Sequence, residues 1–68
     1  MNNNIPIFIR LRSGGGVEGM LNVNCINCIV PHSDTFTYVY MNRREEPLYV
    51  EESYEDIKKK LQNAVWIL

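Results

Sequence analysis

The sequence predicts a small α+β domain, mainly β, in which five antiparallel strands form a meander or open barrel with one C-terminal helix. Three observations predict this fold class. Segments with strand-like alternation recur as far as Glu51, short turn sequences separate them, and the last segment has a helical period with a capped start. Consecutive strands joined by short connections must be antiparallel, because parallel neighbours need long crossovers.

The 68 residues are expected to form one domain. A chain of this length buries only about 60% of the surface that its unfolded state exposes. Apolar residues make up 46% of the chain and charged residues 22%, which is a globular composition. Two cysteines are too few to staple so small a core, so we expect a homo-oligomer. The polar start, residues 1–4, is expected to fray and be disordered.

Seven Lys and Arg residues and eight Asp and Glu residues give a net charge of −1. This balance lacks the positive excess that attracts nucleic acid or an anionic membrane, so general phosphate binding is disfavoured. No positively charged start leads into an apolar run, and polar residues interrupt the longest uncharged stretch, residues 19–33. We therefore expect neither a signal peptide nor membrane insertion, and the sequence predicts a cytoplasmic protein with free thiols.

The first two strands are predicted to form a hairpin over residues 5–24. Its inner face is expected to carry Ile5, Ile7, Ile9, Leu11, Val17, Gly19, Leu21 and Val23. Ser13 and three glycines lie between the strands. A phosphate-binding loop would lead from a strand into a helix, whereas here a strand follows, so a plain turn is the favoured interpretation.

Residues 24–31 are predicted to form a third strand and residues 35–41 a fourth. The fourth, TFTYVYM, is apolar on both faces, so its pattern does not identify the buried one. This two-sided apolarity indicates that the helix covers one face and another subunit the other. The expected interface residues are Phe36, Tyr38, Tyr40 and Trp66.

A charged loop, residues 42–47, leads to the last strand, in which Leu48 and Val50 are expected to face inward. The helix is predicted to begin after Ser53, whose hydroxyl can accept from a free backbone N–H of the first turn. Asp56 is expected to support this cap and to pair with a lysine four residues later. The apolar stripe of the helix consists of Tyr54, Ile57, Leu61, Ala64, Val65 and Leu68.

Cys25, Cys28 and His32 are the one group that suggests metal or redox chemistry. A zinc site needs four ligands, and the C-x-x-C has no second ligand pair in this chain. Residues three apart on a strand point to opposite faces, which keeps the two thiols from sharing an ion or a bond. We therefore expect core-filling cysteines, a solvated loop histidine, no cofactor and no enzyme activity. The remaining metal alternative is a site shared by two chains.

The sequence predicts a non-catalytic, oligomeric protein-interaction module. The alternative function is binding of RNA or single-stranded DNA by stacking and phosphate contact. The residues that suggest it are Arg10, Arg12, Arg43 and Arg44, together with Tyr38 and Tyr40. Glu45 and Glu46 follow directly and cancel much of the positive field. Charged residues in hairpins also protect strand edges from aggregation, which accounts for the same residues without a ligand.

Strands followed by V-E-E-S-Y-E-D-I, residues 50–57, resemble the FlbD-like family of short bacterial flagellar accessory proteins. The matching positions are Val50, Glu52, Ser53, Glu55 and Ile57, with Asn22, Ile26, Thr37 and Val39 roughly in place earlier in the chain. The chain departs from the family in its Arg-Ser-Gly-Gly-Gly turn, its charged loop and its C-x-x-C. The resemblance implies a small, cytosolic, non-enzymatic and oligomeric protein whose partner is another protein.

Overall fold

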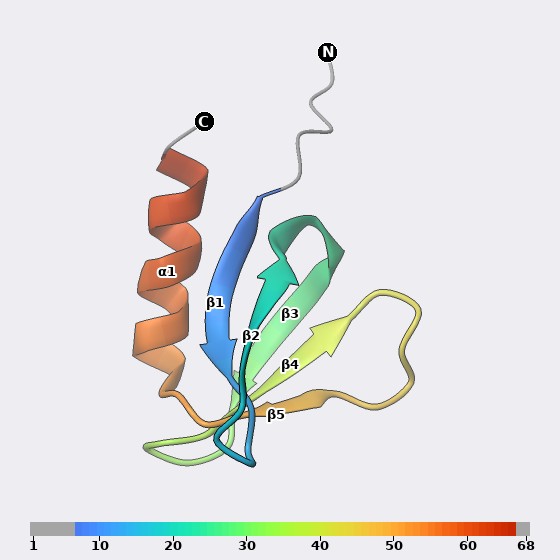
Figure 1. Ribbon diagram of the computed structural model, residues 1–68, viewed down its shortest axis with the longest axis vertical. Coiled ribbons are helices and arrows are strands. Elements are labelled where there is room, and N and C mark those ends of the chain that lie inside the picture. Colours follow the sequence, from blue (N-terminus) through green and yellow to red (C-terminus); the bar gives the residue numbers. More distant parts are fainter. Residues whose placement is uncertain (1–6, 67–68) are drawn as a thin grey trace.

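The computed structural model describes residues 7–66, the last two by their backbone alone. Five antiparallel strands and one C-terminal helix form two small sheets, which confirms the predicted fold class (Figure 1). The elements are β1 (Phe8–Arg12), β2 (Glu18–Asn22), the 3-10 helix η1 (Val23–Cys25), β3 (Ile26–Pro31), β4 (Thr37–Met41), β5 (Leu48–Val50) and α1 (Tyr54–Trp66). The predicted frayed start, residues 1–4, and Ile5 lie outside the described residues.

The two sheets meet at one corner. β1 pairs with β2 in one sheet, and β3, β4 and β5 follow one another in the other. Ser13, directly after β1, forms an antiparallel bridge with Val50 of β5. Beside it, the Gly14 N–H donates to the Tyr49 carbonyl oxygen at 2.7 Å. The described strands therefore form a curved, open arrangement and not a closed barrel.

The hairpin between β1 and β2 is a plain turn, as predicted. The Ser13 N–H donates to the Val17 carbonyl at 2.8 Å, and the Gly16 N–H donates to the Ser13 carbonyl at 2.9 Å. Gly16 has φ +83°, a conformation that glycine adopts without steric cost. The prediction that Val17 faces inward is wrong. Its side chain is 68% exposed, because the chain is still leaving the turn and β2 begins only at Glu18.

The core lies between the two sheets and the helix. Its buried apolar side chains are Ile9, Leu11, Val39, Met41, Val50, Ile57 and Ala64. On β4, Thr37, Val39 and Met41 are the buried residues, which identifies the inner face that the sequence pattern left open. Leu48 and Leu61, both predicted to face inward, are half-buried and pack against this core. The core is therefore assembled from β1, β4, β5 and α1 together.

The connection between β2 and β3 differs from the prediction. The third strand was expected over residues 24–31, but it begins at Ile26, after η1. The Asn22 side-chain oxygen accepts from the Asn24 N–H at 2.9 Å and so caps this short helix. An asparagine side chain that bonds the backbone two residues on favours such a turn over continued strand.

The helix begins as predicted. The Ser53 hydroxyl oxygen accepts from the Asp56 N–H at 3.1 Å, which satisfies one free donor of the first turn. Ile57 and Ala64 are buried, and α1 packs against β1 and β3. Figure 1 shows α1 alongside β1, on the side away from β2. The predicted stripe also includes side chains outside the described part of the structure, those of Val65 and Leu68.

One acidic side chain closes the edge of β1 that does not pair with β2. The Glu52 carboxylate accepts from the Arg12 N–H at 2.9 Å and from the Lys60 ammonium at 2.6 Å. Lys60 also donates to the Arg10 carbonyl at 2.6 Å. The predicted pairing of Lys60 with Asp56 is therefore replaced by pairing with Glu52. The reason is that Lys60 turns toward the sheet, where a backbone carbonyl offers a second acceptor.

Replacing Ile57 by alanine should lower the free energy of unfolding by about 2 to 5 kcal/mol. Ile57 is 0% exposed, so the shortened side chain leaves a cavity in the core. Lys58→Ala, on the exposed side of the same helix turn, is the matched control and should change stability by less than about 0.5 kcal/mol. Urea unfolding followed by circular dichroism measures both. Equal stability of Ile57→Ala and the unmodified chain would contradict the packing of α1.

Candidate functional site: an aromatic face on the three-stranded sheet

The outer side of the β3–β4–β5 sheet carries a cluster of rings. Successive residues of a strand point to opposite faces, so the buried Thr37, Val39 and Met41 leave Tyr38 and Tyr40 pointing outward. Tyr38 is paired with Tyr49 of β5, which brings a second tyrosine to the same face. The sequence therefore builds this surface by alternation along β4 and by its register with β5.

Four rings make up what we call the aromatic face: His32, Phe36, Tyr38 and Tyr49. Phe36 stacks on Tyr49 with ring centroids 4.5 Å apart and planes 7° apart. Tyr38 lies 5.5 Å from Tyr49, and His32 lies 4.9 Å from Tyr38 and 5.5 Å from Tyr49. Aromatic pairs at these separations attract each other beyond the area that they bury. The aromatic face is thus a contiguous, mutually packed surface.

A tight loop between β3 and β4 positions two of these rings. The N–H groups of His32 and Ser33 both donate to the Phe36 carbonyl, at 3.0 and 3.1 Å. The Ser33 hydroxyl oxygen accepts from the N–H groups of Thr35 and Phe36, at 3.3 and 3.2 Å. These bonds fold the loop back on itself, and the rings of His32 and Phe36 both pack against Tyr49 of β5.

The aromatic face is open to solvent. Tyr49 is 41% exposed. Val30 of β3, which pairs with Tyr38 of β4, is 40% exposed. The helix contributes to the core that includes Val39, on the other side of the sheet. Large apolar groups therefore remain accessible across three adjacent strands, and such a contiguous patch marks a contact surface more often than scattered apolar residues do.

The expected interface residues are placed in different ways. Phe36 and Tyr38 both belong to the aromatic face, whereas Tyr40 is half-buried and lies farther along β4, across from Cys28. The side chain of Trp66 lies outside the described part of the structure. Sequence reasoning missed Tyr49, although its position between the inward Leu48 and Val50 indicates an outward side chain.

His32 is an exposed loop residue, as predicted, but its ring packs against two tyrosines instead of standing free in solvent. No local pattern predicts the contact with Tyr49, because that tyrosine lies on β5, 17 residues further along the chain.

The two cysteines occupy different environments. Cys25 is half-buried in η1 and packs against the core, whereas Cys28 is exposed on β3; both are free thiols. The prediction of a core-filling role is therefore wrong for Cys28. A register shift between Ile26 and Cys28 places Cys28 across from Tyr40 on the outer side. Within residues 7–66, no three His, Cys, Asp or Glu side chains are arranged to hold a metal ion.

The arginines expected in a nucleic-acid surface are separated. Arg10 and Arg12 lie on β1, and Arg43 and Arg44 lie in the loop between β4 and β5, on the opposite side of the molecule (Figure 1). Arg43 has φ +67°, and the Arg44 side chain donates to the Glu46 carbonyl at 3.4 Å. The described strands under the aromatic face contain no Lys or Arg. The structure therefore does not combine the four arginines with the tyrosines.

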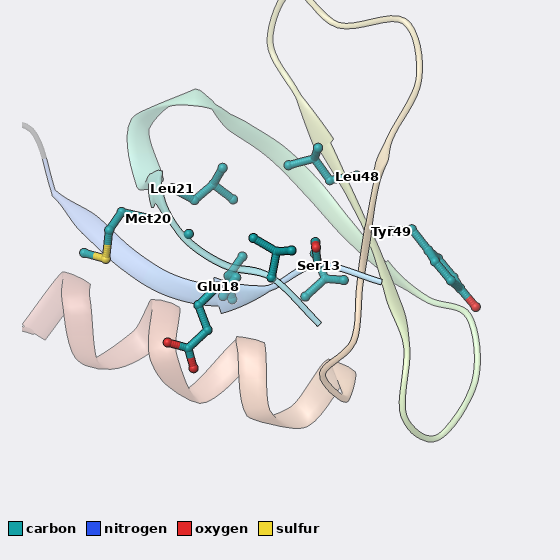
Figure 2. A pocket seen from close by; sticks show the side chains of 10 residues that line it. Ser13, Glu18, Met20, Leu21, Leu48 and Tyr49 are labelled. Atoms are coloured by element: carbon teal, nitrogen blue, oxygen red, sulfur yellow. The ribbon is translucent and has the colours of Figure 1, made fainter. Parts of the chain in front are cut away.

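A recess of about 260 Å³ opens between β2 and β5 (Figure 2). Its lining is mostly apolar and comprises Leu11, Ser13, Val17, Glu18, Gly19, Met20, Leu21, Leu48, Tyr49 and Val50. Figure 2 shows Leu21 and Leu48 directed toward each other across the recess, while the Tyr49 side chain points away from it. The mostly apolar lining of this recess suits contact with apolar groups.

Comparison with family models, curated proteins and solved structures gave no match for this chain. No helix among the described residues is long and apolar enough to cross a membrane.

Gly14 should tolerate alanine less well than its neighbour Gly15 in the same hairpin turn. A Cβ at Gly14 would lie 2.7 Å from Cδ2 of Tyr49, whereas a Cβ at Gly15 would have no neighbour within 4 Å. Gly14→Ala must displace the Tyr49 ring and should lower the free energy of unfolding by about 1 to 3 kcal/mol. Gly15→Ala should change it by less than about 0.5 kcal/mol. Thermal unfolding of the two variants measures the difference, and equal effects would contradict the contact.

Proposed function

We propose that this protein is a non-catalytic protein-interaction module that self-associates through the aromatic face. The observation that carries the proposal is the exposed row of Val30, Tyr38 and Tyr49, one residue from each of the three strands. At one end of this row, the Phe36 ring stacks on the Tyr49 ring. Tyrosines each bury large areas at low conformational cost, and aromatic side chains are enriched at protein interfaces.

Two further features support contact with a protein surface. The strands under the aromatic face lack lysine and arginine within the described residues, and charged groups are depleted at the centre of protein interfaces. In addition, a 68-residue chain has a small core, and association is a common source of additional stability for such domains. Both features favour a second chain over a small charged ligand.

The resemblance at residues 50–57 suggests the biological process in which the module acts, namely flagellar function, as an accessory protein in the cytoplasm. The resemblance implies no catalysis and a protein partner, and the apolar character of the aromatic face supports the second of these. The process itself stays a prediction.

Single-stranded nucleic acid is the less favoured ligand. Bases bind by stacking on free aromatic rings beside cations that contact phosphates. Here Phe36 and Tyr49 already stack on each other, and the arginines lie on other parts of the surface. The packing of the rings therefore supports a protein partner instead.

Light scattering tests the proposal. The unmodified chain at micromolar concentration should have a mass above the 8.0 kDa of one chain. Tyr38→Ser combined with Tyr49→Ser should lower that mass, because both substitutions remove apolar area from the aromatic face. Glu55→Ser combined with Lys58→Ser, on the exposed side of α1, is the matched control and should leave the mass unchanged. An unmodified chain that is a monomer, or a tyrosine variant with undiminished mass, would contradict the proposal.

A further inference from the structure

The second strand of the hairpin presents an open edge. In an antiparallel pair, residues alternate between those that bond the partner strand and those whose N–H and C=O point away from it. The backbone N–H and C=O of Arg12 both point to the side of β1 that faces away from β2. There the N–H donates to the Glu52 carboxylate, and the C=O accepts from the Glu51 N–H. Its pair with Glu18 is therefore of the non-bonded type, and so is the pair of Arg10 with Met20.

It follows that the N–H and C=O of Glu18 and Met20 point away from β1, toward the free edge of β2. The hydrogen bonds at both ends of the hairpin agree with this alternation of bonded and non-bonded pairs. The Ser13 N–H donates to the Val17 carbonyl, and the Val23 N–H donates to the Ile7 carbonyl. β2 pairs with no strand other than β1 among the described residues. Met20 is 61% exposed, so this edge is accessible to another chain.

The other strand edges are protected. The far edge of β1 is closed by Glu52 and Lys60. β3 contains a register shift after Ile26 and ends at Pro31, and bulges and prolines are devices that keep edges from pairing. β5 is three residues long, and its far edge already bonds the hairpin turn at Tyr49. Of the described strands, β2 is the one without such protection.

We propose that this edge pairs with β2 of a second copy, antiparallel and centred on Met20. In this register each Met20 faces the other, and both can exchange their N–H···O bonds. Glu18 faces Asn22 of the second copy, so no two like charges oppose each other, whereas pairing centred on Glu18 would place two carboxylates together. The strand is therefore self-complementary in hydrogen bonding and in charge.

The same register is also complementary in shape. Gly19 faces Leu21 of the second copy, and a Cβ built at Gly19 has no neighbour within 4 Å. Both residues point to the inner side of the hairpin, where the recess lies beside Leu48 (Figure 2). The leucine of the second copy can thus fill the space that the glycine leaves open. This arrangement is β-strand addition, in which main-chain bonds give affinity and side-chain recesses give specificity.

The interface does not depend on the aromatic face. An isologous contact at β2 uses the same patch on both copies. A chain with two separate self-contacting surfaces can form assemblies larger than a dimer, and the loss of one surface leaves the other in place.

Amide hydrogen exchange on the unmodified chain tests the inference directly. The Met20 amide should become at least tenfold more protected as the protein concentration rises from low micromolar to millimolar, because its N–H gains a partner only in the pair. The Leu21 amide, which already bonds β1, is the internal reference. A Met20 amide that exchanges at the same rate at every concentration, or that changes only in step with Leu21, would overturn the proposal.

Cross-linking gives an independent readout. On a Cys25→Ala, Cys28→Ser background, Met20→Cys should form disulfide-linked dimers under mild oxidation at least tenfold faster than Arg10→Cys. Paired residues of this type have Cα atoms about 5.5 Å apart, within the range that a disulfide spans. Arg10 is the cross-strand neighbour of Met20 and is exposed, but it lies on β1, away from the edge. Equal rates would overturn the proposal.

Adding Tyr38→Ser and Tyr49→Ser to the Met20→Cys chain separates the two surfaces. The cross-link should persist at an unchanged rate, because the tyrosines lie on the other sheet. A cross-link lost with the tyrosines would show that the contact belongs to the aromatic face, which overturns the β2 interface while leaving the proposed function intact.

Discussion

The structure depends on how the backbone of β1 is satisfied on the side where no strand pairs with it. A strand edge left unpaired is costly when buried and prone to aggregation when exposed. Here the Glu52 carboxylate binds the Arg12 N–H, and Lys60 binds the Arg10 carbonyl and the carboxylate together. The Glu52 carbonyl also accepts from the buried Thr37 hydroxyl at 2.8 Å. One residue thereby joins β1, β4 and the helix.

This junction explains why the helix lies beside β1 and why the remaining surfaces are open. With α1 against the edge of β1 and over the core, neither the outer side of the three-stranded sheet nor the free edge of β2 is covered by another described element (Figure 1). The first surface is aromatic and the second is a row of backbone groups beside an apolar recess. The two surfaces would be used by different kinds of contact, side-chain packing in one case and strand pairing in the other.

Much of the fold could be predicted from local pattern. The alternation in β1, the hairpin glycines and the Ser53 cap each depend on neighbouring residues, and all three are confirmed by the structure. Errors occurred where a local signal competed with another. The Asn22 side chain turned the chain into η1 where a strand was expected, and Val17 fell into the turn.

The candidate site was less predictable because it is made by register between distant residues. Tyr38 could be assigned to an outward face only after Thr37 was known to be buried, and its neighbour Tyr49 follows from the pairing of β4 with β5. The role of Glu52 was hidden for the same reason. Its sequence position suggested a favourable charge near the helix start. Its carboxylate instead accepts from the Arg12 N–H on β1, which lies 40 residues away in the sequence.

A double-mutant cycle on Glu52 and Lys60 tests this account most directly. The free energy of unfolding would be measured at one protein concentration for the unmodified chain, Glu52→Gln, Lys60→Met and the double variant. If the carboxylate and the ammonium act together on the edge of β1, the two substitutions should be coupled by about 0.5 to 3 kcal/mol. Effects that simply add, to within about 0.3 kcal/mol, would contradict the claim that this pair holds the helix to the sheet.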